Sequence, residues 1–205
     1  APVVRVDAGG ELILNNAPTS TANIAKEGAG ALTFNYDVGA TLPATIVHNA
    51  GALGFTGTQS FGAAAIPAGR QFKFNSDPGA GVDITAPAGT AVIAGFAAAD
   101  QLLPRINAAS AGTLALGVDS AAALDFSADP TLSLGATGLR TYSGAITPGA
   151  SGYRVGGGGG TLRLTQALTG TNNLTVSGAG TVVPASASTF TGNVAIDGGT
   201  LQVIN

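Results

Sequence analysis

Short segments with apolar residues at alternate positions recur along the whole chain. This alternation is typical of β-strands that bury one face, because successive side chains of a strand point to opposite sides. The predicted strands cover residues 12–14, 32–36, 53–55, 72–74, 82–84, 114–116, 124–126, 132–134, 162–164, 174–176, 194–196 and 201–203. The polar or charged residue in the middle of a segment is expected to face solvent.

Turn-forming residues separate these strands, for example at Gly9-Gly10, Pro78-Gly79, Pro148-Gly149 and Gly178 to Gly180. Glycine and proline interrupt regular structure and mark turns. Strands this brief and this regularly bounded exclude a helical domain. They leave a sandwich, a barrel or a solenoid.

A fixed repeat interval favours the solenoid, since sandwich strands need not recur at one spacing. The sequence Gly-Thr followed by an aliphatic residue occurs at Gly160-Thr161-Leu162, Gly180-Thr181-Val182 and Gly199-Thr200-Leu201, at intervals of 20 and 19 residues. Gly112-Thr113-Leu114 is an earlier instance. We interpret this interval as one coil of a β-helix.

A second spacing agrees with the first. Phe72, Val82 and Val92 lie ten residues apart, and so do Leu114 and Leu124, which gives about two strands per coil. The predicted fold class is therefore all-β, a parallel β-helix (β-solenoid) with about 20 residues per coil. At a strand spacing of roughly 4.8 Å, on the order of ten coils would form a column roughly 45 to 50 Å long. Its stability would come mainly from the stacking of neighbouring coils.

One segment breaks the strand pattern. Residues 97–103 are rich in alanine and leucine without alternation and are followed by Pro104, which predicts a short helical excursion near 97–108. The two interpretations are a lateral excursion from the column and a boundary between two stacked segments, and we favour the excursion. The predicted organisation is one continuous domain, with N-terminal coils over 1–93, the excursion over 94–110 and C-terminal coils over 111–205.

Composition narrows the class of protein. Only 9% of the residues are charged and the net charge is −3, so the chain lacks the basic stripe that nucleic-acid binding needs. Cysteine is absent, which excludes disulfides and thiolate metal sites. No apolar run approaches the ~20 residues that span a bilayer.

Glycine takes 32 positions in the sequence and alanine takes 39. We expect glycine at the corners and alanine inside a narrow stack that excludes large aromatic side chains.

The C-terminal part resembles a known repeat. Residues 173–183, 188–192 and 194–203, with their Ser-Gly-Ala-Gly-Thr and Asp-Gly-Gly-Thr-Leu sequences, look like the autotransporter-associated β-strand repeat of large bacterial surface proteins. Upstream, residues 111–116, 124–127, 132–136 and 153–162 are similar to spacer regions of such proteins. The resemblance implies a right-handed parallel β-helix that is secreted and serves as a stalk, adhesin or matrix element. Pro184 departs from the repeat and predicts a bend or an edge position there.

Few residues offer catalytic chemistry. His48 is the only histidine, and its setting after Ile46 and Val47 favours a strand end over a catalytic triad. Paired carboxylates are the more serious alternative, because two acids on one face can cleave glycosidic bonds. Asp83 and Asp125 occupy outward positions of predicted strands, and Asp119 and Asp129 flank Asp125. Solubilising charges are the competing interpretation of these acids.

Three further motifs are incomplete. Gly156 to Gly160 lacks the Lys-Ser/Thr of a phosphate-binding loop and leads into a strand, so we predict a turn between coils. Asp77 and Asp83, six residues apart, lack the alternating acids of a calcium loop. Asn173-Leu174-Thr175 has the form of a glycosylation sequon. We expect no catalytic residue, cofactor or metal site.

Neither end of the sequence resembles a cap. Residues 201–205 and 3–6 are still strand-like, and an uncapped β-helix exposes a whole coil of unpaired backbone. We therefore expect either further coils in a longer chain or head-to-tail stacking of copies. The predicted function is an extracellular or cell-surface stalk, filament or matrix fibre. The expected partner is another copy of the same chain or further coils of it, and surface glycans are a further candidate. We expect neither nucleic-acid binding nor membrane insertion. The alternatives are a carbohydrate-binding or polysaccharide-cleaving β-helix and an adhesin that uses residues 94–110.

Overall fold

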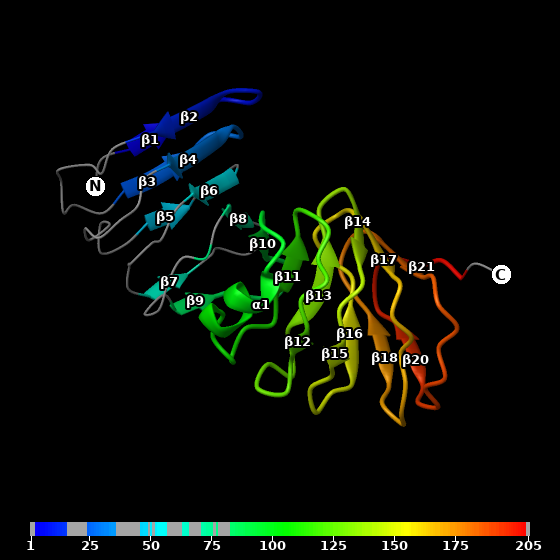
Figure 1. Ribbon diagram of the computed structural model, residues 1–205. Coiled ribbons are helices and arrows are strands. Elements are labelled where there is room, and N and C mark those ends of the chain that lie inside the picture. The colour runs from blue at the N-terminus through cyan, green and yellow to red at the C-terminus, as the bar shows by residue number, and fades with distance from the viewer. Residues whose placement is uncertain are drawn as a thin grey trace.

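Parallel strands stack along a single axis from one end of the molecule to the other (Figure 1). The computed structural model describes residues 3–15, 24–35, 46–48, 50, 52–56, 63–65, 71–75, 77 and 83–203. The first described strands lie at one end of the column and the last at the other (Figure 1). The predicted parallel β-helix with about 20 residues per coil is confirmed.

One wall of the column is a ten-stranded parallel sheet in the described part of the chain. Its strands, in spatial order, are β2 (Glu11–Leu14), β4 (Ala31–Asn35), β6 (Ala52–Thr56), β8 (Gln71–Phe74), β10 (Ala91–Ala94), β11 (Thr113–Leu116), β13 (Ser133–Ala136), β16 (Tyr153–Val155), β18 (Leu174–Val176) and β20 (Val194–Ile196). Each strand pairs with the strand one coil away. The ten strands therefore agree with the number of coils expected from the sequence.

Shorter sheets form the other walls. One holds β14 (Leu139–Tyr142), β17 (Thr161–Leu164), β19 (Thr181–Pro184) and β21 (Thr200–Leu201). The remaining sheets hold β1 (Val3–Arg5), β3 (Ile24–Glu27) and β5 (Ile46–His48), then β7 (Ala63–Ala65) and β9 (Asp83–Thr85), and finally β12 (Leu124–Asp125) and β15 (Ile146–Thr147). The three Gly-Thr motifs at 160, 180 and 199 lead into β17, β19 and β21, in successive coils of one sheet. The motif at Gly112 differs, because it leads into β11 of the long sheet.

Glycine in these motifs is required by the stacking of coils. Gly180 has φ +119°, and a Cβ there would lie 2.4 Å from the carbonyl oxygen of Gly160. A Cβ on Gly160 would in turn lie 2.3 Å from backbone atoms of Gly138. Side chains cannot fit where one coil lies directly on the backbone of the preceding one. The expectation of glycine at the corners therefore has a specific steric cause.

The core consists of columns of apolar side chains that repeat once per coil. One column of the long sheet runs through Phe72, Val92, Leu114, Leu134, Val155, Val176 and Ile196, and Leu32 holds the same register position nearer the N-terminal end. The expectation that large aromatic side chains are excluded is wrong. Phe72 and Phe74 are fully buried and contact each other edge to face, with ring centroids 6.3 Å apart. Phe74 lies in register with Phe55 in the preceding coil and with the small Ala94 in the following one.

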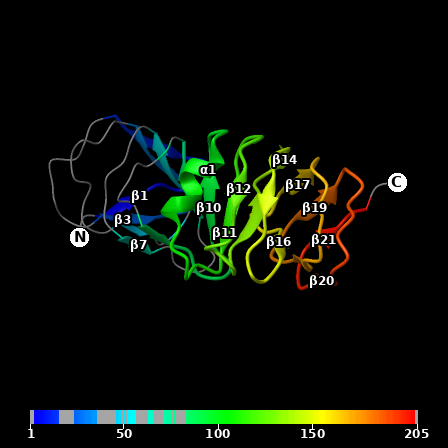
Figure 2. The same cartoon turned by 60° about the horizontal axis from the view of Figure 1, so that its bottom comes forward.

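The predicted helical segment is present and forms part of the wall. It comprises the α-helix α1 (Ala99–Leu102) and the 3₁₀-helix η1 (Leu103–Arg105). Leu102 and Leu103 are buried in the core, so the segment covers the interior as a strand would and does not simply project from the column. Figure 2 shows α1 beside β10 and β12. On either side of the segment, Val92 pairs with Leu114, so the long sheet continues without a break.

Not every middle residue of a strand faces solvent. Lys73, Asp125 and Arg163 are exposed as expected, whereas Ala115 and Ser133 are buried on the outward face of the long sheet. The glycine segment that follows β16 covers this face, since a Cβ on Gly158 would lie 3.1 Å from the Cβ of Ala115. Alternation in the sequence identifies the two faces of a strand, but it does not reveal a loop from a later coil.

The sequence predicts a bend or an edge position at Pro184. The structure makes it the last residue of β19, which has β17 on one side and β21 on the other, and places it in register with Leu164. The N–H of Thr181 donates to the carbonyl of Gly160, just before β17, and the N–H of Ala185 donates to the carbonyl of Leu164. On the other side, the N–H of Gln202, just after β21, donates to the carbonyl of Val182. Alternate residues of a parallel strand bond to opposite neighbours, so the missing N–H of Pro184 lies on the β21 side. There the described pairing ends at Val182 with Leu201.

Candidate functional site

The last described coil exposes residues that belong to the core columns. Val176 is 1% exposed, whereas Ile196, its register partner in β20, is 55% exposed. Leu174 and Val194 show the same change in the neighbouring column. The backbone conformation and residue type are similar in the two coils, so the difference arises because no further coil covers β20.

An apolar hollow accompanies this exposed coil. A cavity of about 530 Å³ lies among Leu174, Phe190, Val194, Leu201 and Val203, with the segment 184–188 as its remaining wall. Its lining residues come from β18, β20, β21 and their neighbouring segments, in the last described coils of the column. Apolar surface with a free strand edge is typical of a surface that binds another β-element.

The opposite end has the same character. Leu12 is 39% exposed, whereas Leu32, one coil further into the column, is fully buried. Ile13 and Val3 are also exposed, and β1 and β2 are the edge strands of their sheets in the described part of the molecule. Both ends thus present apolar side chains together with strand edges, and we take this pair of surfaces as the candidate functional site.

The predicted acids Asp83 and Asp125 belong to strands of different sheets, β9 and β12. The side chain of Asp83 lies outside the described part of the structure, as does that of His48 in β5. The pairing of Asp83 with Asp125 therefore stays a prediction from the sequence.

Asp125 and Asp129 differ in their protonation behaviour. The N–H of Ser127 donates to Oδ1 of Asp125 at 2.9 Å, and this hydrogen bond lowers the pKa of Asp125. Burial raises the pKa of Asp129, and the negative charge of Asp125 raises it further. Opposite pKa shifts in neighbouring acids suit acid–base chemistry where a substrate can reach them. Among the described residues, no aspartate or glutamate lines the apolar hollow, the groove over Thr113 and Gly157, or the small cavity beside Tyr142.

The other polar candidates have structural contacts. Oδ1 of Asp119 accepts from the Thr141 N–H, and Asp77 forms an ion pair with Arg105 at 3.4 Å. Oδ1 of Asn173 accepts from Asn193 N–H at 2.9 Å, which links two coils at the sequon. Within the described residues, no three His, Cys, Asp or Glu side chains lie close enough to hold a metal ion.

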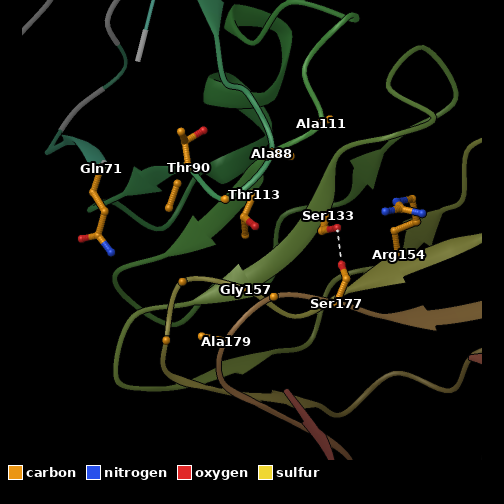
Figure 3. A pocket seen from close by; sticks show the side chains of 16 residues that line it. Gln71, Ala88, Thr90, Ala111, Thr113, Ser133, Arg154, Gly157, Ser177 and Ala179 are labelled. Carbon is orange, nitrogen blue, oxygen red and sulfur yellow. Dashed lines mark hydrogen bonds between the residues drawn. The ribbon is translucent and has the colours of Figure 1, made fainter. Parts of the chain in front are cut away.

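The sequence did not reveal two sets of polar residues. Lys26 is fully buried and donates to three backbone carbonyls. Thr113, Ser133 and Arg154 line a second cavity, with the glycine segment 157–159, on the outward face of the long sheet (Figure 3). The segment that we predicted to be a turn joins β16 to β17 within one coil and also forms a wall of this cavity. No local motif marks these residues, because coils about 20 and 40 residues apart bring them together.

Comparison with known proteins yields no matching family, curated protein or solved structure. Among the residues that the structure describes, no helix is both long enough and apolar enough to span a membrane.

Proposed function

We propose that this chain is a structural β-solenoid segment that builds a stalk or filament through the stacking of its last coil on the first coil of another copy. The exposure of the core columns at β20, where Ile196 occupies the position that Val176 occupies in the buried coil below, carries the proposal. A further coil would bury these side chains and pair the free edge of β20.

Energetics support a second copy as the partner. Full burial of a large aliphatic side chain contributes about 1.5–3 kcal/mol, and Ile196 and Val194 are each about half exposed. The net charge of −3 over 205 residues produces little repulsion between copies. Contact between opposite ends is heterologous and does not close on itself, so stacking generates an open filament. Further coils in a longer chain would cover the same surface in the same way.

The proposal includes an extracellular or cell-surface location. Its support is the resemblance of residues 173–203 to the autotransporter-associated β-strand repeat. No specific observation favours a polysaccharide-cleaving enzyme at Asp83 and Asp125 or an adhesin that uses residues 94–110, and we propose a non-enzymatic role.

The test is elongation of the purified 205-residue chain. We expect sedimentation velocity and negative-stain microscopy to show rods that lengthen as the protein concentration rises. Ile196→Lys places an unpaired charge between the stacked coils, and desolvation of that charge opposes association. We expect this variant to need at least about tenfold higher concentration for the same rod length, which corresponds to ~1.4 kcal/mol.

Leu139→Lys is the matched control, because Leu139 is an equally exposed leucine on β14, on the side of the column. It adds the same charge without touching either end, and rods should form as in the wild type. A wild-type chain that stays monomeric at millimolar concentration would refute self-stacking. Equal elongation of the Ile196→Lys chain would show that the contact lies elsewhere.

A further inference from the structure

A polar groove lies on the side of the column, away from both ends. Its cavity of about 380 Å³ crosses the outward face of the long sheet from β8 to the turn after β18 (Figure 3). This volume is typical of small-ligand sites. The floor carries hydroxyl groups rather than the exposed long side chains usual on such a face.

The glycine segment after β16 builds one wall of the groove. Gly157, Gly158 and Gly159 all have φ between 79° and 86°, a conformation that side chains rarely adopt. A Cβ on Gly157 would lie 2.2 Å from Oγ1 of Thr113, two strands back in the long sheet. Within the described chain, the amides of Gly157 and Gly158 have no hydrogen-bond acceptor. The groove therefore has backbone donors available beside its hydroxyl groups.

Thr113 provides the most informative side chain. It is only 8% exposed as a residue and lines the groove, and its hydroxyl makes no hydrogen bond to any residue that the structure describes. That hydroxyl is not among the buried unpaired atoms of the described residues, so it is open to the groove and can donate to and accept from water or a ligand. Nearby, the hydroxyl groups of Ser133 and Ser177 lie 3.2 Å apart (Figure 3). A ligand with several hydrogen-bonding groups would satisfy this floor.

Among the described residues that line the groove, Arg154 is the single ionisable side chain. Its Nε–H donates to the carbonyl oxygen of Thr131 at 3.2 Å, which fixes the stem and leaves the two terminal nitrogens for a ligand. No carboxylate pairs with Arg154 in the described part of the structure. One fixed guanidinium matches one carboxylate, which it can bind with two parallel hydrogen bonds.

We propose that this groove binds a sugar acid, in the form of uronate units of an acidic polysaccharide. The guanidinium of Arg154 holds the carboxylate, and Thr113, Ser133, Ser177 and the glycine amides bind the sugar hydroxyl groups. The described residues of the lining include no aromatic side chain for stacking on a neutral sugar ring. The affinity therefore depends on the charge. This inference is independent of stacking, because the groove lies on the side of the column.

Calorimetry and ¹⁵N-detected NMR titration test the proposal with di- and trigalacturonate as probes. We expect saturable binding, with shifts at the amides of Gly157 and Gly158, and at least about tenfold weaker binding of the neutral galactose oligomers. Titrations with sulfate and acetate separate the sugar acid from a simple anion. Equal affinity for acetate or sulfate would mean that the groove is a general anion site and would overturn the proposal, as would the absence of binding.

Two pairs of variants locate the site. Arg154→Gln should weaken binding about tenfold or more, whereas Arg163→Gln, an exposed arginine on β17, should leave it unchanged. Gly157→Ala should abolish binding because its methyl group meets Thr113, whereas Gly170→Ala, outside the groove, has a similar positive φ of 83° and no atom closer than 3.7 Å to its Cβ, so it should leave binding unchanged. Circular dichroism on all four variants establishes that they fold. Equal binding by the two members of either pair would refute this placement of the ligand.

Discussion

At the scale of single residues, polar groups in this molecule connect one coil to the next. The ammonium of Lys26 donates to the carbonyl oxygens of Glu27 at 2.7 Å, of Gly28 at 2.8 Å and of Ala50 at 3.1 Å. Burial lowers the pKa of Lys26, while the charge of Asp7 opposes that effect. The buried lysine therefore depends on these carbonyl oxygens to replace its water.

Lys26→Met tests this dependence. Methionine retains an apolar stem of similar length but leaves the three carbonyl oxygens without this donor, so we expect the free energy of unfolding to fall by about 1–3 kcal/mol. Urea denaturation followed by circular dichroism measures the change. Lys73→Met is the control, since Lys73 is exposed on β8, and it should change stability by less than about 0.5 kcal/mol. Equal effects of the two substitutions would contradict a structural role for Lys26.

The sequence predicts residue roles only where a role depends on the residue's own strand. The alternation in 72–74 identifies Phe72 and Phe74 as inward and Lys73 as outward, and the structure agrees. It cannot identify Thr113 as a buried group, because the covering residue Gly157 is 44 positions away and belongs to another coil. Long-range covering contacts carry no local signal, so the groove was not predictable from the pattern.

At the scale of elements, strand positions are predictable and strand partners follow from the period. The twelve predicted segments all overlap strands, although the structure adds others such as β14 and β15. β15 has only two residues, too few for alternation to be visible. The segment 97–108 is predictable as helical from alanine, leucine and Pro104. The position of this segment in the wall is not predictable from the sequence. It arises because Leu102 and Leu103 face inward and cover the core.

Leu102→Ala tests whether the helical segment supports the fold. Leu102 is fully buried in the core, and truncation of a buried leucine to alanine typically costs about 2–5 kcal/mol. We expect a loss in that range in urea denaturation. Gln101→Ala alters the exposed neighbour on the same turn and should be close to neutral. A loss below about 0.5 kcal/mol for Leu102→Ala would mean that the segment is a lateral excursion after all.

At the scale of the whole molecule, one interaction is repeated from coil to coil. Each column places similar side chains at intervals of about 20 residues, and each coil is buried mainly by its two neighbours. A first or last coil has only one neighbour, which explains why Leu12 and Ile196 are exposed while the column between them is buried. The open ends are thus a physical consequence of the same repetition that makes the fold predictable.

This repetition also fixes the register in which copies would stack. If the column that ends at Ile196 continues into Leu12 of the next copy, Ala195 lies opposite Glu11 of that copy. Their Cα atoms would then be about 4.8 Å apart, a separation that a disulfide can bridge. The chain contains no cysteine, so the double variant Glu11→Cys with Ala195→Cys should form a ladder of covalent oligomers when oxidised, visible on non-reducing gels. In the control pair, Ile13→Cys with Ala195→Cys, the cysteines lie on a diagonal of about 7–8 Å, and cross-linking should be much weaker. Equal ladders from both pairs would show that copies meet without a fixed register, and rods without any ladder would mean that their contact does not continue the long sheet.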